Sequence, residues 1–168
     1  MDLRVTNWSN AQYTEWGAGR RRCAVGSGGI AQKIREGDGV TPVGTWPLRR
    51  VFYRPDRMMA PRCALPVAPL QPHDGWCETP GDPEYNTLVR LPHRASAESM
   101  WREDHLYDVV VVVGYNDAPV VAGKGSAIFL HLARTEYTPT AGCVALALPD
   151  LLEVLLQLTP DDRLIVTA

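Results

Sequence analysis

The sequence predicts a mainly β fold, either a mixed β-sandwich or a flattened barrel, with two short helices and long loops. Strand-like apolar runs alternate with turns rich in glycine and proline. Five consecutive valines at 109–113 are typical of a strand buried on both faces. Only residues 96–105 and 151–158 carry helix signals. Because no linker or repeat is visible, we expect a single domain over residues 1–168.

The first third of the chain is predicted to hold short strands separated by irregular backbone. Residues 1–8 alternate as a strand, and residues 22–25 form another that ends at the glycines of 26–29. Residues 33–46 are rich in Gly, Pro and Thr, which favour turns over a helix. A further strand is expected at 48–53.

The middle of the chain contains a long segment without periodicity. Residues 55–92 carry many prolines, and such stretches often form lids or binding loops. Trp76 and Tyr85 are expected there as exposed aromatic side chains. Residues 96–105 are predicted to form a short helix with Ser96 as its N-cap.

The second half is predicted to contain the centre of the sheet. The valine run 109–113 is its central strand, and residues 120–122 are expected to begin a partner strand. Residues 125–130 should form a strand that delivers His131 at its end. Another apolar strand is expected at 142–148.

The end of the chain has a helical leucine pattern at 151–158. Asp150 and Glu153 have the spacing of a capping box before it. The leucine stripe is that of a core-facing helix and not of a partner-binding one. Residues 163–167 are expected to close the fold as a strand.

Composition excludes several classes of function. The net charge is −2, which gives no basic footprint for nucleic acid. No apolar run approaches the roughly 20 residues that cross a bilayer, so no transmembrane segment is expected. The first residues do not have the pattern of a signal peptide. Either the protein stays inside the cell, or its export signal lies outside this sequence.

The four cysteines, Cys23, Cys63, Cys77 and Cys143, have long and irregular spacings. None forms a C-x-x-C pair, which disfavours a structural zinc site, so we expect no metal. A bridge between Cys63 and Cys77 stays open for an exported protein. Cys23 is expected as a small core residue.

Cys143 and His131 are the candidate catalytic pair. Gly142 lets the backbone approach a substrate closely, and the amides of Gly142 and Cys143 are expected to face a developing oxyanion. Adjacent antiparallel strands would bring His131 to Cys143, and an imidazole activates a thiol by taking its proton. The alternative is a buried structural cysteine beside a core histidine.

Several blocks of the sequence match the pattern of a known family. Residues 129–146 contain a histidine, a loop and then Thr-Ala-Gly-Cys before a hydrophobic residue. Residues 28–44 contain Gly-Gly, a lysine, Gly-Asp-Gly and Thr-Pro-Val-Gly. Together with shorter blocks at 52–57, 75–77 and 125–129, they resemble the L,D-transpeptidase catalytic (YkuD) family over most of the chain.

The resemblance implies a YkuD-like fold with Cys143 as nucleophile and His131 as general base. It also implies that the backbone carbonyl of Leu132 orients the imidazole, as a carboxylate does in a triad. Ala141 stands where most of the family has a second histidine, and Ala145 replaces a common arginine. The interval from histidine to cysteine is also shorter than usual. The chain therefore resembles a divergent branch with a changed substrate or acceptor preference.

Seven side chains are candidate substrate-binding groups. They are Arg54, Arg57, Trp76, Tyr115, Asn116, Ser126 and Thr140. The two arginines have the planar forks that grip carboxylates of an acidic stem peptide. Their alternative is an ordinary surface pair with Asp56, which contributes little.

Each of the other five also has a structural alternative. Trp76 stacks on substrate or pins a long loop. Tyr115 and Asn116 contact substrate at a strand end or belong to an ordinary turn. Ser126 faces the cleft or caps a backbone group. Thr140 donates its hydroxyl near the oxyanion or bonds within its own turn.

By resemblance, the expected activity is cysteine-dependent acyl transfer on peptidoglycan stem peptides, without metal or organic cofactor. Cys143 attacks an L-configured centre at diaminopimelate or L-alanine, and an amine of a second stem resolves the thioester into a cross-link. Carbapenems are candidate inhibitors. Such a cross-linker would work in the periplasm or cell wall.

Three rival interpretations are open. Water could resolve the thioester, which would make the protein a cytoplasmic L,D-carboxypeptidase that trims murein peptides. A catalytically dead murein-binding module would carry an unreactive Cys143. A papain-like protease is disfavoured because the cysteine follows the histidine and lacks that family's surrounding signature.

Overall fold

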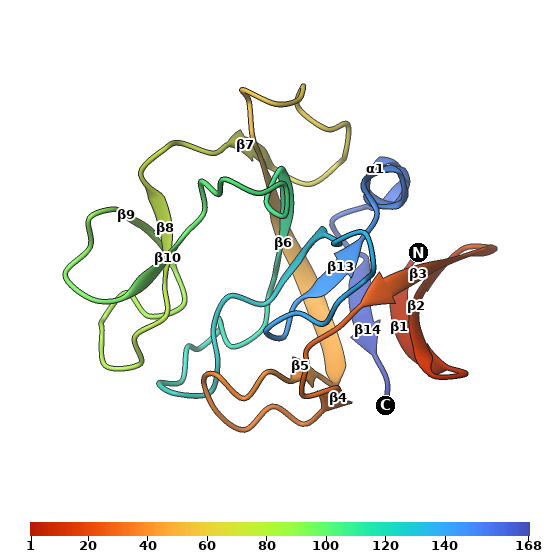
Figure 1. Ribbon diagram of the computed structural model, residues 1–168, viewed down its shortest axis with the longest axis horizontal. Coiled ribbons are helices and arrows are strands. Elements are labelled where there is room, and N and C mark those ends of the chain that lie inside the picture. The colour runs from red at the N-terminus through yellow and green to blue at the C-terminus, as the bar shows by residue number, and fades with distance from the viewer.

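The computed structural model describes residues 1–168, and its main element is a mixed sheet that closes on itself as a barrel. The strand order is β11 (Val109–Val113), β12 (Phe129–Leu132), β13 (Val144–Leu146), β3 (Gly19–Ala24), β2 (Ala11–Trp16), β1 (Leu3–Trp8), β14 (Arg163–Val166), β6 (Gly44–Tyr53) and β7 (Val67–Pro69). The barrel closes because β6 also pairs with β11. The mainly β class predicted from the sequence is confirmed (Figure 1).

A smaller sheet of three strands lies beside the barrel, on the side opposite the N-terminal strands β1 to β3 (Figure 1). Its order is β10 (Ala97–Ser99), β8 (Asp74–Cys77) and β9 (Leu88–Arg90). A short parallel pair, β4 (Ile30–Ala31) and β5 (Thr41–Pro42), lies in the segment that was expected to be irregular. The segment 55–92, which has no periodicity in the sequence, contains strands β7, β8 and β9.

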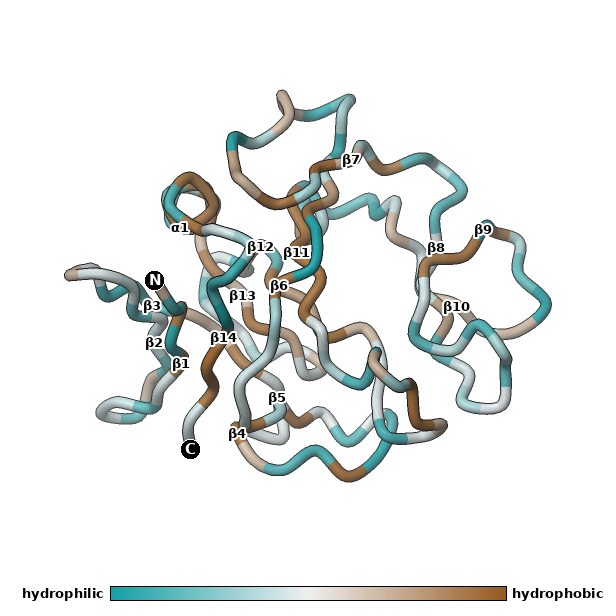
Figure 2. The backbone as a smooth tube through the Cα atoms, turned by 180° about the vertical axis from the view of Figure 1, so that it is seen from behind, coloured by the Kyte–Doolittle hydropathy of each residue, from teal (hydrophilic) through white to brown (hydrophobic).

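Strand β11 explains how the hydrophobic core is divided. Its five valines are all buried. In Figure 2 the hydrophobic colour marks β11 in the middle of the molecule. Val109 and Val111 belong to the large cluster inside the barrel, whereas Val110 and Val112 belong to a second cluster with Phe129 and Trp76. Alternate side chains of a strand point to opposite faces, so this strand is shared by two cores. Its prediction as a central buried strand is confirmed.

The helix near the C-terminus begins earlier than predicted, and its expected cap is wrong. Helix α1 spans Leu148–Gln157 with Ala147 as N-cap, and no side chain caps it. Asp150 and Glu153 instead face Arg21 of β3, at 3.2 and 3.4 Å. Leu151, Val154 and Leu155 are buried against the barrel. This is the only helix, and no helix is long and apolar enough to span a membrane.

The predicted helix at 96–105 is wrong. Residues Ala97–Ser99 form β10, which pairs antiparallel with β8. Ser96 does not cap a helix, since its carbonyl accepts hydrogen bonds from the backbone N–H of Glu78 and the hydroxyl of Thr79. Cross-strand pairing here outweighs the local helix signal.

Two predicted strands near the site are also corrected. Residues 120–122 form an exposed turn and not a partner strand. Residues 125–128 are irregular, with Ala127 at φ 53°, so only Phe129–Leu132 forms the strand that carries His131. Strands β12 and β13 run parallel, whereas the sequence analysis assumed antiparallel neighbours.

The glycine-rich turn after β3 packs directly on the turn before Cys143. Gly26 and Thr140 form an isolated parallel bridge, and the Gly26 amide donates to the buried Thr41 hydroxyl at 2.8 Å. That hydroxyl donates to the Gly142 carbonyl, also at 2.8 Å. A Cβ on Gly26 would overlap the carbonyl of Gly39 and lie 2.9 Å from the Cα of Gly142. Only glycine fits at position 26.

Gly26→Ala should therefore destabilise the fold by at least about 3 kcal/mol, because the clash is with backbone that has no rotamer to change. Gly81→Ala is the matched control, since a Cβ there meets nothing within 4 Å. We expect the control to stay within about 0.5 kcal/mol of wild type. Urea unfolding of the three proteins checks this, and equal midpoints would show that the turn contact is unimportant.

Candidate active site

Cys143 and His131 line the same cavity, which has a volume of about 340 Å³. It lies between the ends of β12 and β13, the loop 134–141, and the smaller sheet. His131 pairs in register with Ala145, so Cys143 and His131 belong to the same face of two neighbouring strands. Ala145 also lines the cavity, where its small side chain leaves room beneath the pair.

The thiol of Cys143 is buried and held by the backbone. It donates to the carbonyl of Ala127 at 3.2 Å and accepts the amide of Phe129 at 3.4 Å. Burial raises the pKa of the thiol to about 12, and the nearby carboxyl of Glu98 acts in the same direction. The cysteine therefore rests as a neutral thiol.

The imidazole of His131 is oriented by the contact that the family resemblance implied. Nδ1 donates to the backbone carbonyl of Leu132 at 2.9 Å, in the tautomer with hydrogen on Nδ1. The ring packs edge-on against Tyr107, with centroids 5.4 Å apart. Burial lowers the pKa of the imidazole to about 4. Nε2 makes no hydrogen bond within the chain, so this lone pair is free to take a proton.

The turn that precedes the cysteine differs from the expected oxyanion site. The amide of Gly142 donates to the Thr140 hydroxyl at 3.1 Å, so it is not free. The same hydroxyl donates to the carbonyl of Cys143 at 2.6 Å. Thr140 therefore bonds within its own turn, which was the alternative to a role near the oxyanion. The amide of Cys143 has no partner within the chain. This one amide is therefore the available backbone donor beside the sulfur.

The cavity also contains charged groups that sequence reasoning did not find. Glu98 of β10 accepts a hydrogen bond from the buried Tyr107 hydroxyl at 2.6 Å and lies 3.5 Å from Arg102. Burial raises the pKa of Glu98, although the Tyr107 hydrogen bond opposes this. Because the helix predicted at 96–105 hid β10, no sequence signal pointed to Glu98. Arg134 also lines the cavity, and its guanidinium makes no hydrogen bond or ion pair within the chain.

Arg54 and Arg57 do not reach the cavity. Arg54 is buried, binds both oxygens of Asp56, and stacks 3.7 Å over the ring of Trp101. Arg57 binds Asp108 at 2.7 Å and nearby backbone carbonyls. Both guanidinium groups use their hydrogen bonds to hold the 54–58 turn against residues 102–108. We therefore do not propose them as substrate ligands.

Three further candidates lie in structural positions outside the cavity. Trp76 is buried against Phe129 and donates to Asn86 at 2.9 Å. The Tyr115 hydroxyl donates to the carbonyl of Lys124 at 2.8 Å. Asn116 bonds the backbone of the turn that follows it. None of the three lines the cavity.

Of the seven candidate substrate-binding side chains, Ser126 and Thr140 are the two that line the cavity. Ser126 lines the cavity, is buried, and its hydroxyl has no hydrogen-bond partner. Tyr85 is buried and not exposed as expected. Its hydroxyl bonds Glu36 and accepts the Gly125 amide at 3.0 Å, which fixes the backbone just before Ser126.

A family model for YkuD, the L,D-transpeptidase catalytic domain, matches residues 4–166. The chain therefore belongs to the YkuD family, and the resemblance seen in the sequence is confirmed. Comparisons with curated proteins and with solved structures gave no significant match. Membership identifies the chain as an L,D-transpeptidase-type protein, whereas the roles of individual residues are proposed below.

The depressed pKa of His131 makes stability depend on acid. The folded chain resists protonation of this imidazole down to about pH 4, while an unfolded histidine binds a proton near pH 6.5. Between these values the unfolded state holds more protons, so stability is full above pH 6.5 and falls as the pH drops toward 4. We expect a loss on the order of 3 kcal/mol from this residue.

Urea unfolding at pH 7 and pH 4 measures this loss for the wild type and for His131→Gln. The glutamine variant removes the titrating group, so its stability should fall less across the same range. If both proteins lost equal stability, burial of a neutral His131 would not be the cause.

Proposed function

We propose that this chain is a cysteine-dependent L,D-transpeptidase that acts on peptidoglycan stem peptides. The observation that supports this best is a buried thiol and a buried imidazole at one cavity, with the imidazole fixed by the Leu132 carbonyl at 2.9 Å. Such a pair is suited to acyl transfer through a thioester, which is the chemistry of the family to which the chain belongs.

In the proposed reaction, proton transfer and attack occur together. Both groups rest neutral, and a buried thiolate beside Glu98 would be costly. As Cys143 Sγ bonds to the substrate carbonyl carbon, its proton passes to Nε2 of His131. The Cys143 amide stabilises the oxyanion. His131 then protonates the leaving amine. A second amine attacks the thioester and gives its proton to Nε2 of His131, which passes it to Cys143 Sγ as the carbon–sulfur bond breaks.

The charges around the cavity support a substrate with both signs of charge. Arg134 is an exposed and unpaired cation, whereas Glu78 and Glu98 lie on the side of the smaller sheet. A stem peptide that ends in diaminopimelate carries carboxylates and a free amine. We propose that Arg134 binds a substrate carboxylate and that the glutamates favour the amine.

Cross-linking and hydrolysis share the same acyl-enzyme and differ in the acceptor. If water resolves the thioester, the protein is an L,D-carboxypeptidase. We propose cross-linking, in the periplasm or cell wall, as the main activity, and a cytoplasmic location accompanies the alternative. Product analysis separates the two.

Incubation with disaccharide-tetrapeptide and disaccharide-tripeptide fragments should yield cross-linked dimers, which mass spectrometry detects. Cys143→Ala should abolish them, because no thioester can form. Monomers shortened by one residue, without dimers, would establish the carboxypeptidase. If neither product forms and a carbapenem adds no mass to Cys143, the chain is a binding module and the proposal fails.

Arg134→Ala should raise KM for the stem peptide about tenfold or more and leave kcat nearly unchanged, since it removes one charge-assisted contact with bound substrate. Arg62→Ala is the matched control, because Arg62 is exposed and makes no contact with the cavity. Initial rates over a range of substrate concentrations separate the two constants. An unchanged KM would remove Arg134 from the substrate site.

A further inference from the structure

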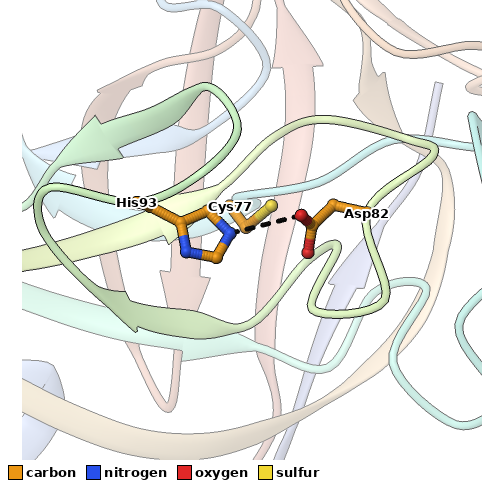
Figure 3. A group of neighbouring side chains, drawn as sticks. All are labelled: Cys77, Asp82 and His93. Atoms are coloured by element: carbon orange, nitrogen blue, oxygen red, sulfur yellow. Dashed lines mark ion pairs between the residues drawn. The ribbon is translucent and has the colours of Figure 1, made fainter.

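Three potential metal ligands converge beside the C-terminal end of β8 in the smaller sheet. Cys77 is the last residue of β8, Asp82 follows in the next turn, and His93 lies just after β9. One ligand atom from each lies within 4.8 Å of the others. Figure 3 shows the sulfur of Cys77 beside the line that joins the imidazole of His93 to the carboxylate of Asp82.

The hydrogen bonding of these side chains is incomplete, although they are buried. Cys77 is fully buried, and its thiol makes no hydrogen bond. The His93 side chain is only 7 % exposed, and its Nε2 has no hydrogen-bond partner. The nearest carboxylate oxygen, Oδ2 of Asp82, is 3.4 Å away. A buried polar nitrogen without a partner is costly, and native proteins usually satisfy such groups.

Asp82 is oriented by neighbours that leave one oxygen open. Its Oδ1 accepts the amide of Glu84 at 2.8 Å and the guanidinium of Arg94 at 2.7 Å. Oδ2 accepts no hydrogen bond and lies 3.4 Å from Nε2 of His93. Hydrogen bonds of this kind to the non-ligating atom are typical of metal-bound carboxylates.

We propose that Cys77, Asp82 and His93 bind Zn²⁺ through Sγ, Oδ2 and Nε2, with water as the fourth ligand. A thiolate, an imidazole and a carboxylate together suit a borderline-soft ion such as Zn²⁺ and disfavour Mg²⁺ or Ca²⁺. Ligand atoms around tetrahedral Zn²⁺ are about 3.3–3.8 Å apart, so small side-chain movements close the site. Binding releases the thiol proton of Cys77.

The ion would tie the β8–β9 connection, through Cys77 and Asp82, to the β9–β10 connection, through His93. Cys77 pairs with Ala97 of β10, next to Glu98, and is followed by Glu78. Both glutamates line the cavity, so the site lies behind the wall that faces Cys143. The ion therefore has a structural role, outside the reaction. The absence of C-x-x-C pairs argued against zinc in the sequence, but this site takes its ligands from one cysteine, one aspartate and one histidine.

The test is a Co²⁺ titration of the reduced, metal-free full chain, followed by displacement with Zn²⁺. We expect one Co²⁺ per chain, with a near-ultraviolet sulfur-to-cobalt charge-transfer band that Zn²⁺ abolishes at one equivalent. Cys77→Ser should lose the band, and His93→Gln should weaken Co²⁺ binding at least tenfold. Circular dichroism of each variant checks that it is folded.

Cys63→Ser and Cys143→Ala are the matched controls, since both remove a thiol outside the cluster and should keep the band. The proposal is overturned if the wild type gives no band, or if the band survives in Cys77→Ser. It is also overturned if the band disappears in Cys143→Ala, because the metal would then bind the thiol of the cavity. If Cys77→Ser does not fold, full-strength Co²⁺ binding by His93→Gln overturns it alone.

Discussion

The parallel pairing of β12 with β13 is the constraint on which the site depends. Parallel strands cannot be joined by a tight hairpin, so the chain between His131 and Cys143 must cross over from one end of the strands to the other. This crossover supplies the rim of the cavity, including Arg134 and Thr140. The same pairing puts the histidine and the cysteine on one face. The shared location of Cys143 and His131 and the rim of the cavity thus both follow from the parallel direction of β12 and β13.

Burial then determines how the pair can react. Cys143 and His131 are removed from water, which favours the uncharged form of both. A preformed thiolate–imidazolium pair, as in proteases with an electropositive site, is therefore not the resting state here. Charge separation is expected only when a substrate carbonyl is present to accept it. In the proposed reaction, the thiol of Cys143 would therefore stay unreactive in the absence of substrate, and its free backbone amide would stabilise the negative charge that forms during attack.

The sequence predicted the fold class, the valine strand and the shared location of Cys143 and His131, because these depend on local pattern and on family motifs. It failed where distant parts of the chain decide the outcome. Residues 96–105 have a helix-like start, but pairing with β8 makes them a strand. Arg54 has the chemistry of a carboxylate ligand, yet Trp101 and Asp56 hold it inside a turn. Glu98 could not be found, since its place in the cavity follows from that unexpected strand.

The division of the core by β11 has a consequence for how this protein can change through evolution. Val109 and Val111 face the barrel cluster, while Val110 and Val112 face the cluster beneath the smaller sheet. Most of the buried apolar residues lie in the barrel cluster, so the barrel supplies most of the stability. The smaller sheet can therefore acquire substitutions or insertions at modest cost to the stability of the barrel. Changes to its buried residues would still affect Cys143, which belongs to the same cluster as Trp76, so new specificities are expected to arise in its exposed loops.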